Sequence, residues 1–337
     1  MLEIYGTLGP NCSDKETLKA MFREGMNGVR LNLSHTCLED AAQQIETLHK
    51  AAAECGVKAE LLIDMQGPEL RVGKMEKTVE LKSGESVCLG EGGIPVPDIC
   101  LPHLKKGQEV LLDDGKLLLE AEEAGEGYVT ARVKLGGILK GRKSIALPGA
   151  EIHPPALTES DRKNLAQAKS FGVTAVMQPF VRGSEDLEEL RAELDKAGGE
   201  DIRIFAKIEN MEGVKALDGI MREADLIVIA RGDLGNALPL WELPALQKEI
   251  SRACLEKGKP FMVVTQMLAS MEHSPVPTRA EVSDIFNAVL DGASSVMVTG
   301  ETAVGEYPVR VIEYMSKTAR EAEKYMGKRA IDYQHPF

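Results

Sequence analysis

Three charged residues stand at the ends of apolar runs that have the length of buried strands. Lys207 and Glu209 follow the run 204–206, and Asp233 follows the run 226–230. Two carboxylates are hard oxygen ligands that suit Mg²⁺ or Mn²⁺ better than Zn²⁺, for which the sequence has no His/Cys cluster. A lysine beside such a metal can stabilise negative charge that develops on a substrate. The combination predicts metal-assisted chemistry with an electrophilic lysine.

Taken singly, each of these residues has a structural explanation that is as good as the functional one. A lysine at a strand end can pair with a neighbouring carboxylate, and an acidic residue there can stabilise the next helix. The other polar residues at predicted strand ends are Arg30, Asn32, Ser34, His35, Asp64, Arg231, Thr265, Thr299 and Glu301. A structural role does not explain so many groups of both charges, so we expect one functional site.

These positions belong to a regular alternation of strands and helices. The predicted strands are 3–8, 28–35, 59–64, 175–180, 204–208, 226–230, 261–267 and 295–301. Segments with helical periodicity lie between them, including 38–55, 184–197, 242–257, 279–290 and 308–326. This order predicts an α/β fold in which eight parallel strands close into a (β/α)8 TIM barrel. Catalytic groups of such barrels lie at the C-terminal strand ends.

The segment 72–150 departs from this alternation. Its apolar stretches are short and are separated by turn-rich sequence, which is typical of a small antiparallel β domain. We therefore predict a barrel made of 1–71 and 151–337, with 72–150 inserted after the third strand as a lid. One continuous α/β domain is the alternative, but it requires the helices to disappear along the whole of this segment.

Composition limits the classes of partner and the compartment. The 337 residues carry a net charge of −13, which argues against nucleic acid and anionic membranes as partners but not against small anionic substrates. The six cysteines show no CxxC spacing, so we expect reduced thiols. The sequence shows neither a signal peptide nor an apolar run of roughly 18 residues, which predicts a cytoplasmic location.

Several stretches resemble those of the pyruvate kinase family. They are Gly9-Pro10, 26–35, 61–71, 147–161, 206–214, 230–235, 264–268, 277–284 and 298–308. They occur in the family's order and spacing from residue 3 to about 325, so the set is highly specific. The inserted domain resembles the family's mobile lid, somewhat shortened. The family's C-terminal regulatory domain is expected to be absent.

The resemblance implies a glycolytic phosphotransferase that moves the phosphoryl group of phosphoenolpyruvate to ADP, giving pyruvate and ATP. Mg²⁺ (or Mn²⁺) and K⁺ are the implied cofactors, and a homo-oligomer is left open. Lys207, Arg30 and Thr265 would be catalytic, with Arg30 on the phosphoryl oxygens and Thr265 near the enolate carbon. Gly232 and Asp233 would bind the substrate carboxylate through their amides, beside Thr265 and Arg30.

Metal and nucleotide ligands are implied in the same way. Glu209 and Asp233 would hold the divalent metal. The implied potassium ligands are Asn32, Ser34, Asp64 and the backbone carbonyl of Met65, and Glu69 matches the glutamate of potassium-dependent members. The implied nucleotide contacts are Arg71, Lys143 and Asp114.

Departures from the family pattern leave alternatives open. Gln66 replaces a lysine, Pro179 a serine and Asn236 a valine. These changes are either drift in a divergent kinase or signs of a changed phosphoryl donor or acceptor. A metal-dependent lyase or aldolase of the phosphoenolpyruvate/pyruvate barrel type is a second hypothesis, against which the lid counts. A catalytically altered metabolite-binding protein is a third, against which the retained Lys207 counts.

Overall fold

The structure is a computed structural model that describes residues 2–34, 36–113, 115–150 and 152–334, with side chains described as far as residue 327. The chain forms two compact units. The larger consists of Met1–Gly67 and Ala156–Phe337, and the smaller of Pro68–Pro155. The smaller unit is therefore a single continuous insertion into the chain of the larger one.

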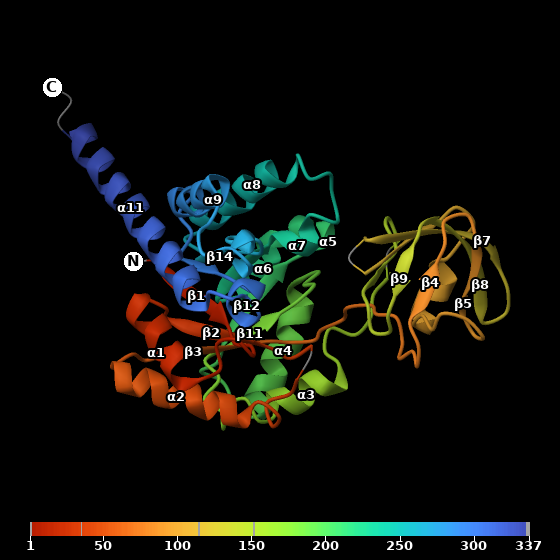
Figure 1. Ribbon diagram of the computed structural model, residues 1–337, viewed down its shortest axis with the longest axis horizontal. Helices are drawn as coiled ribbons and strands as arrows, with labels where there is room; N and C mark the ends of the chain where they lie inside the picture. Colours follow the sequence, from red (N-terminus) through yellow and green to blue (C-terminus); the bar gives the residue numbers. More distant parts are fainter. Residues whose placement is uncertain (1, 35, 114, 151, 335–337) are drawn as a thin grey trace. The chain divides into compact units, whose positions relative to one another are not determined.

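The larger unit is built on a closed barrel of eight parallel strands (Figure 1). Around the barrel the order is β1, β15, β14, β13, β12, β11, β3 and β2. The strands are β1 (Glu3–Thr7), β2 (Gly28–Asn32), β3 (Glu60–Asp64), β11 (Ala175–Gln178), β12 (Arg203–Ile208), β13 (Leu226–Ala230), β14 (Phe261–Val264) and β15 (Ser295–Met297). The predicted TIM barrel is confirmed.

Side chains that alternate along each strand form two separate apolar layers. Met177, Phe205, Val228 and Met262 belong to the cluster that fills the barrel, and their strand neighbours belong to the cluster under the helices. Strands covered on both faces read as continuous apolar runs. This burial explains why charged residues are confined to the strand ends.

Helices surround the barrel and connect successive strands (Figure 1). They are α1 (Lys15–Glu24), α2 (Ala42–Cys55), α3 (Glu159–Leu165), α4 (Ser184–Lys196), α5 (Met211–Lys215), α6 (Leu217–Glu223), α7 (Arg231–Leu234), α8 (Leu243–Glu256), α9 (Arg279–Leu290), α10 (Gly300–Ala303) and α11 (Pro308–Gln334). Thr158 and Thr278 cap α3 and α9 through reciprocal capping boxes. Within the described part of the chain, no helix has both the length and the apolar character needed to cross a membrane.

Two helix ends differ from the sequence-based expectation. The helix expected from residue 38 begins at Ala42, and the amide of Leu38 donates to the side chain of Asn164 at 2.9 Å. The last helix continues beyond the expected end at 326, to Gln334.

The smaller unit has its own antiparallel sheet and its own core. The strands are β4 (Val79–Leu81), β5 (Ser86–Gly90), β6 (Glu109–Leu112), β7 (Leu117–Ala124), β8 (Tyr128–Leu135), β9 (Gly137–Leu139) and β10 (Ile145–Ala146). Five of them form a sheet in the order β10, β6, β7, β8, β5, and β4 pairs with β9. Leu89, Val110, Leu119 and Val133 lie in its buried core. The role of this unit as a lid stays a prediction.

Candidate active site

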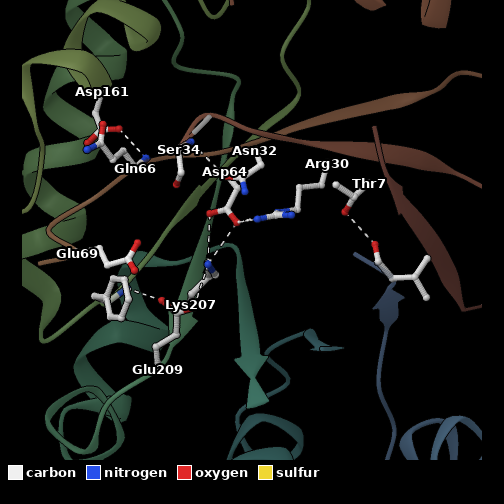
Figure 2. A network of polar contacts seen from close by, with 12 residues as sticks. Thr7, Arg30, Asn32, Ser34, Asp64, Gln66, Glu69, Asp161, Lys207 and Glu209 are labelled. Atoms are coloured by element: carbon white, nitrogen blue, oxygen red, sulfur yellow. Dashed lines mark hydrogen bonds and ion pairs between the residues drawn. The ribbon is translucent and has the colours of Figure 1, made fainter. Parts of the chain in front are cut away.

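A buried charge network lies at the C-terminal ends of β2, β3 and β12 (Figure 2). Lys207 Nζ lies 2.9 Å from Glu209 Oε1 and 3.3 Å from Asp64 Oδ2. The side chains of Lys207, Asp64 and Glu209 are only 13%, 3% and 1% exposed. Because β11 separates β3 from β12, this triad forms only when these three strands are assembled side by side.

Arg30 reaches the same carboxylate from β2. Its Nε donates to Asp64 Oδ2 at 2.7 Å, and its Nη2 lies 2.7 Å from the same oxygen. Burial on its own raises the pKa of Asp64, but the charges of Lys207 and Arg30 outweigh it, so the pKa is below its usual value. Asp64 is therefore an anion that holds two cations side by side.

Lys207 remains protonated in this environment. Burial alone lowers the pKa of an ammonium group, but here the charges of Asp64 and Glu209 outweigh burial and raise the pKa of Lys207 above its ordinary value. An ammonium that keeps its proton at neutral pH is a permanent positive charge in a place with little water. Such a group can offset negative charge on a bound substrate.

Glu209 is held on both of its oxygens. Oε1 faces Lys207, and Oε2 accepts a hydrogen bond from the amide of Phe180 at 2.8 Å. Burial raises the pKa of Glu209; Asp233 and Asp64 raise it further, against the lowering effect of Lys207. Glu209 and Asp233 are thus close enough to repel each other. A divalent cation would remove that repulsion.

The donor set fits a metal that keeps water or substrate ligands. Among the residues that the structure describes, no three or more His, Cys, Asp or Glu side chains are grouped as metal ligands. A site enclosed by protein ligands alone, as structural Zn²⁺ requires, is therefore not formed by these residues. Two carboxylates with other positions left to water and substrate suit Mg²⁺ or Mn²⁺.

Gly232 and Asp233 lie in α7, which begins directly after β13, and Thr265 follows β14. A Cβ atom placed on Gly232 would lie 3.2 Å from Cγ2 of Thr265, so the two segments are in close contact. The structure thus brings Thr265 to the start of α7. Thr265 has a φ of 79°, which is rare for a β-branched residue.

The predicted potassium ligands meet where β2 and β3 end. Asn32 pairs with Asp64 in the strand register, and Asn32 Oδ1 accepts a hydrogen bond from the amide of Ser34 at 3.1 Å. Met65 follows Asp64 directly, and its amide donates to the carbonyl of Met177 at 3.2 Å. Three oxygen-bearing side chains and the Met65 backbone are therefore adjacent, whereas the Met65 side chain is buried.

Two of the predicted nucleotide ligands, Arg71 and Lys143, are neighbours within the smaller unit. The amide of Val72 donates to the carbonyl of Lys143 at 2.8 Å. Arg71 Nη2 pairs with Glu69 at 2.5 Å, and Lys143 Nζ pairs with Asp113 at 2.8 Å. Both cations already have carboxylate partners inside that unit. Asp114 lies outside the described residues.

Three residues with a part in this geometry were given no specific chemical role by the sequence. Phe180 offers its amide to Glu209, and Asp161 accepts from the amides of Gln66 and Gly67 at 2.9 and 3.1 Å. Arg231 donates to the carbonyl of Thr265 at 2.7 Å. Asp161 and Arg231 both stand inside stretches that resemble the family. That position is a sequence signal for Asp161, and Arg231 was marked in the sequence only as a polar residue at a strand end.

Two of the departures from the family pattern meet at Gly67. Gly67 has a φ of 61°, and a Cβ on it would lie 2.3 Å from Cγ of Pro179. Pro179 therefore packs against the backbone next to Gln66. Asn236 is exposed, and its backbone N–H donates to the carbonyl of Asp233 at 3.0 Å.

Comparisons with known proteins agree with this geometry. The family model described as "Pyruvate kinase, barrel domain" matches residues 2–312. A protein named pyruvate kinase from Geobacillus stearothermophilus is 37% identical over 340 residues, which cover 98% of this chain and 58% of that protein. The protein of the same name from Thermococcus litoralis is 39% identical over 332 residues, covering 96% of this chain and 70% of the relative.

A third relative, named pyruvate kinase, from Aeropyrum pernix, is 38% identical over 338 residues, covering 99% of this chain and 74% of the relative. The chain thus spans somewhat more than half of the Geobacillus protein and about three quarters of the Aeropyrum protein. The match of the barrel-domain model extends over most of the chain. The chain belongs to the pyruvate kinase family.

Proposed function

We propose that the chain catalyses transfer of the phosphoryl group of phosphoenolpyruvate to ADP, giving pyruvate and ATP as in glycolysis. The observation that carries this proposal is the buried Lys207, held between Glu209 and Asp64 with its pKa raised. During transfer, the negative charge of a phosphoryl group is spread over its equatorial oxygens. A buried cation with little water around it can stabilise that charge. The names of the relatives support the same reaction.

Glu209 and Asp233 would hold Mg²⁺ or Mn²⁺, and Asn32, Ser34, Asp64 and the carbonyl of Met65 would hold K⁺. When bound, these cations neutralise charge on the phosphoryl group and on the keto-acid. The support is the repulsion between Glu209 and Asp233 and the adjacency of the four oxygen donors. The choice of metal and the requirement for potassium belong to the proposal.

The reaction itself balances as one phosphoryl transfer and one proton transfer. The P–O bond to the enol oxygen breaks with its electron pair left on that oxygen, and a new P–O bond forms to a terminal oxygen of ADP. Lys207 offsets the charge on the phosphoryl group during transfer. The planar guanidinium of Arg30 donates hydrogen bonds to the phosphoryl oxygens. Thr265 passes a proton to the enolate carbon and regains one from solvent, while Gly232 and Asp233 hold the carboxylate through their amides.

Arg71, Lys143 and Asp114 are proposed to bind the nucleotide phosphates, with the smaller unit, expected at 72–150, as the lid. Their support is the resemblance and the close placement of Arg71 and Lys143. A cytoplasmic location and a homo-oligomer also remain proposals. The free cysteines are compatible with a reducing compartment. A metal-dependent lyase or aldolase is not favoured, because the relatives carry the name of a kinase.

The test is a coupled assay for pyruvate and ATP with Mg²⁺ and K⁺ present, and with each cation omitted in turn. We expect turnover that needs Mg²⁺ or Mn²⁺ and falls roughly 100- to 1,000-fold in Lys207→Met. Lys50→Met is the control, because Lys50 is an exposed residue paired with Glu46 on α2. Absence of ADP-dependent turnover under every cation condition would refute the proposal.

A further inference from the structure

Thr265 and Gln266, directly after β14, both have a left-handed backbone. Their φ angles are 79° and 54°. A β-branched residue in this region is an outlier, and such a conformation persists only where the surrounding structure imposes it. A strained residue at the C-terminal end of a barrel strand therefore calls for a group that holds it.

Arg231 is that group. Its Nη2 donates to the carbonyl of Thr265 at 2.7 Å, and its Nε donates to the carbonyl of Val264 at 3.2 Å. These are the last carbonyl of β14 and the first one beyond it, where the strand leaves the sheet. One planar guanidinium thus fixes two successive peptide units, which the single point charge of a lysine cannot do.

The far side of Arg231 is anchored to the outer helices. Its Nη1 lies 2.8 Å from both carboxylate oxygens of Asp284 in α9, and 3.5 Å from Oε1 of Gln247 in α8. Arg231 is only 13% exposed. The guanidinium therefore cannot move without breaking an ion pair as well as both carbonyl contacts. Arg231 links the helical shell to the turn that carries Thr265.

Arg231 also precedes Gly232 and Asp233 in α7. The close contact between Gly232 and Cγ2 of Thr265 means that the turn fixed by Arg231 faces the start of α7. The proposed carboxylate site and the proposed proton donor are thereby held at one distance from each other. Small errors in such a distance are costly, since a displacement of about 1 Å can reduce a rate roughly 100-fold.

We propose that Arg231 is a positioning residue that aims the hydroxyl of Thr265 at the enolate carbon, with Asp284 holding Arg231 in place. This inference rests on the proposed function, because it assigns Arg231 to the proton-transfer half of that reaction. Arg231 itself is not proposed to contact either substrate. Its substitution should therefore impair proton transfer more than binding.

The experiment measures proton transfer and phosphoryl transfer separately, in the variants Arg231→Lys and Arg231→Gln. Exchange of the pyruvate methyl protons for deuterium, followed by NMR in D₂O with Mg²⁺, K⁺ and ATP, reports the proton step. Coupled assays report kcat and the KM values for phosphoenolpyruvate and ADP. Titration with Mn²⁺, followed by its electron paramagnetic resonance signal, reports metal binding without turnover.

We expect exchange and kcat to fall roughly 10- to 100-fold in both variants. Both KM values and the Mn²⁺ affinity should stay within roughly threefold of the wild type, because the Arg231 guanidinium is directed at the Val264 and Thr265 carbonyls and at Asp284. Arg191→Lys is the matched control. Arg191 also donates to a backbone carbonyl, that of Ile202 at 2.9 Å, and lies 3.8 Å from a carboxylate oxygen of Asp225, before the N-terminal end of β12.

Asp284→Asn is a second variant, which keeps the guanidinium of Arg231. It replaces the Arg231 variants in the test if circular dichroism shows that they do not fold. It should slow exchange by a smaller factor, roughly 3- to 10-fold. If folded Arg231→Lys or Asp284→Asn exchanges the methyl protons at the wild-type rate, the inference is wrong. The proposed function is unaffected by that result as long as the wild type transfers the phosphoryl group. If the wild type transfers no phosphoryl group at all, the proposed function fails, and the inference fails with it.

Discussion

Strands β3 and β12 carry an ion pair at each of their two ends, and the pairs differ in burial and composition. At the N-terminal ends, Arg203 contacts Glu60 at 2.5 Å, with side chains 38% and 25% exposed. At the C-terminal ends, Lys207 lies between Asp64 and Glu209, nearly out of contact with water. The first is one cation with one anion, whereas the second is part of a larger network.

This difference separates a structural arrangement from a functional one. An ion pair that reaches water contributes little to stability and costs little to form. Buried charges lose their hydration, and their mutual attraction offsets only part of this free-energy cost. The network of Lys207, Arg30, Asp64 and Glu209 is therefore a poor way to stabilise a barrel and a good way to prepare a site for charged substrates.

The largest contrast is expected from removing the acidic partner at each end. Asp64→Ala leaves Lys207 and Arg30 buried without the carboxylate they share, so it should lower the free energy of unfolding by about 3–5 kcal/mol. Glu60→Ala removes only a partly exposed partner and should cost about 1 kcal/mol or less. Urea denaturation of both variants measures the difference. Equal losses would show that the two ends are not distinct.

The second-largest contrast between the C-terminal and N-terminal ends of β3 and β12 is expected in metal binding. Glu209→Gln keeps the size of the side chain but loses the negative charge proposed to bind Mg²⁺ or Mn²⁺. The affinity for Mn²⁺ should fall roughly 10- to 100-fold, because a proposed ligand is lost. Glu60→Gln, at the other end of the barrel, is the control and should bind Mn²⁺ like the wild type. Unchanged binding in Glu209→Gln would place the metal elsewhere.

Asp161 extends the C-terminal network to the turn after β3. Its carboxylate accepts from the amides of Gln66 and Gly67 and from Thr158. Asp161→Asn should lower the free energy of unfolding by about 1–2 kcal/mol, because an amide group cannot accept all of these hydrogen bonds. It should also raise the K⁺ concentration needed for activity, since the Met65 carbonyl precedes this turn. A normal K⁺ requirement would separate Asp161 from the cation site.

The smallest effect is expected at the N-terminal end. The hydroxyl of Tyr5 donates to Glu3 Oε2 at 2.8 Å. Tyr5→Phe removes this hydrogen bond and should cost about 1 kcal/mol, with no change in turnover. Thermal unfolding and the coupled assay test the two statements. A drop in kcat without a drop in stability would contradict the structural role of this end.

Much of the site could be read from the sequence because its signals are local. Apolar runs that end in polar residues mark the C-terminal ends of barrel strands, and a parallel barrel brings all of those ends to one mouth. Lys207, Glu209, Asp64 and Arg30 were found in this way, and the structure places them together. The resemblance supplied a chemical role for each, which periodicity could not do.

The sequence by itself determined the order of strands and helices and the residue types at the barrel mouth. Only the tertiary structure decided the partners: Lys207 with Asp64 across β11, Glu209 with the amide of Phe180, and Arg231 with Asp284 and the Thr265 carbonyl. The reason is physical. Elements form from neighbours along the chain, whereas these contacts join segments that are distant in the sequence and meet only when the strands pair side by side.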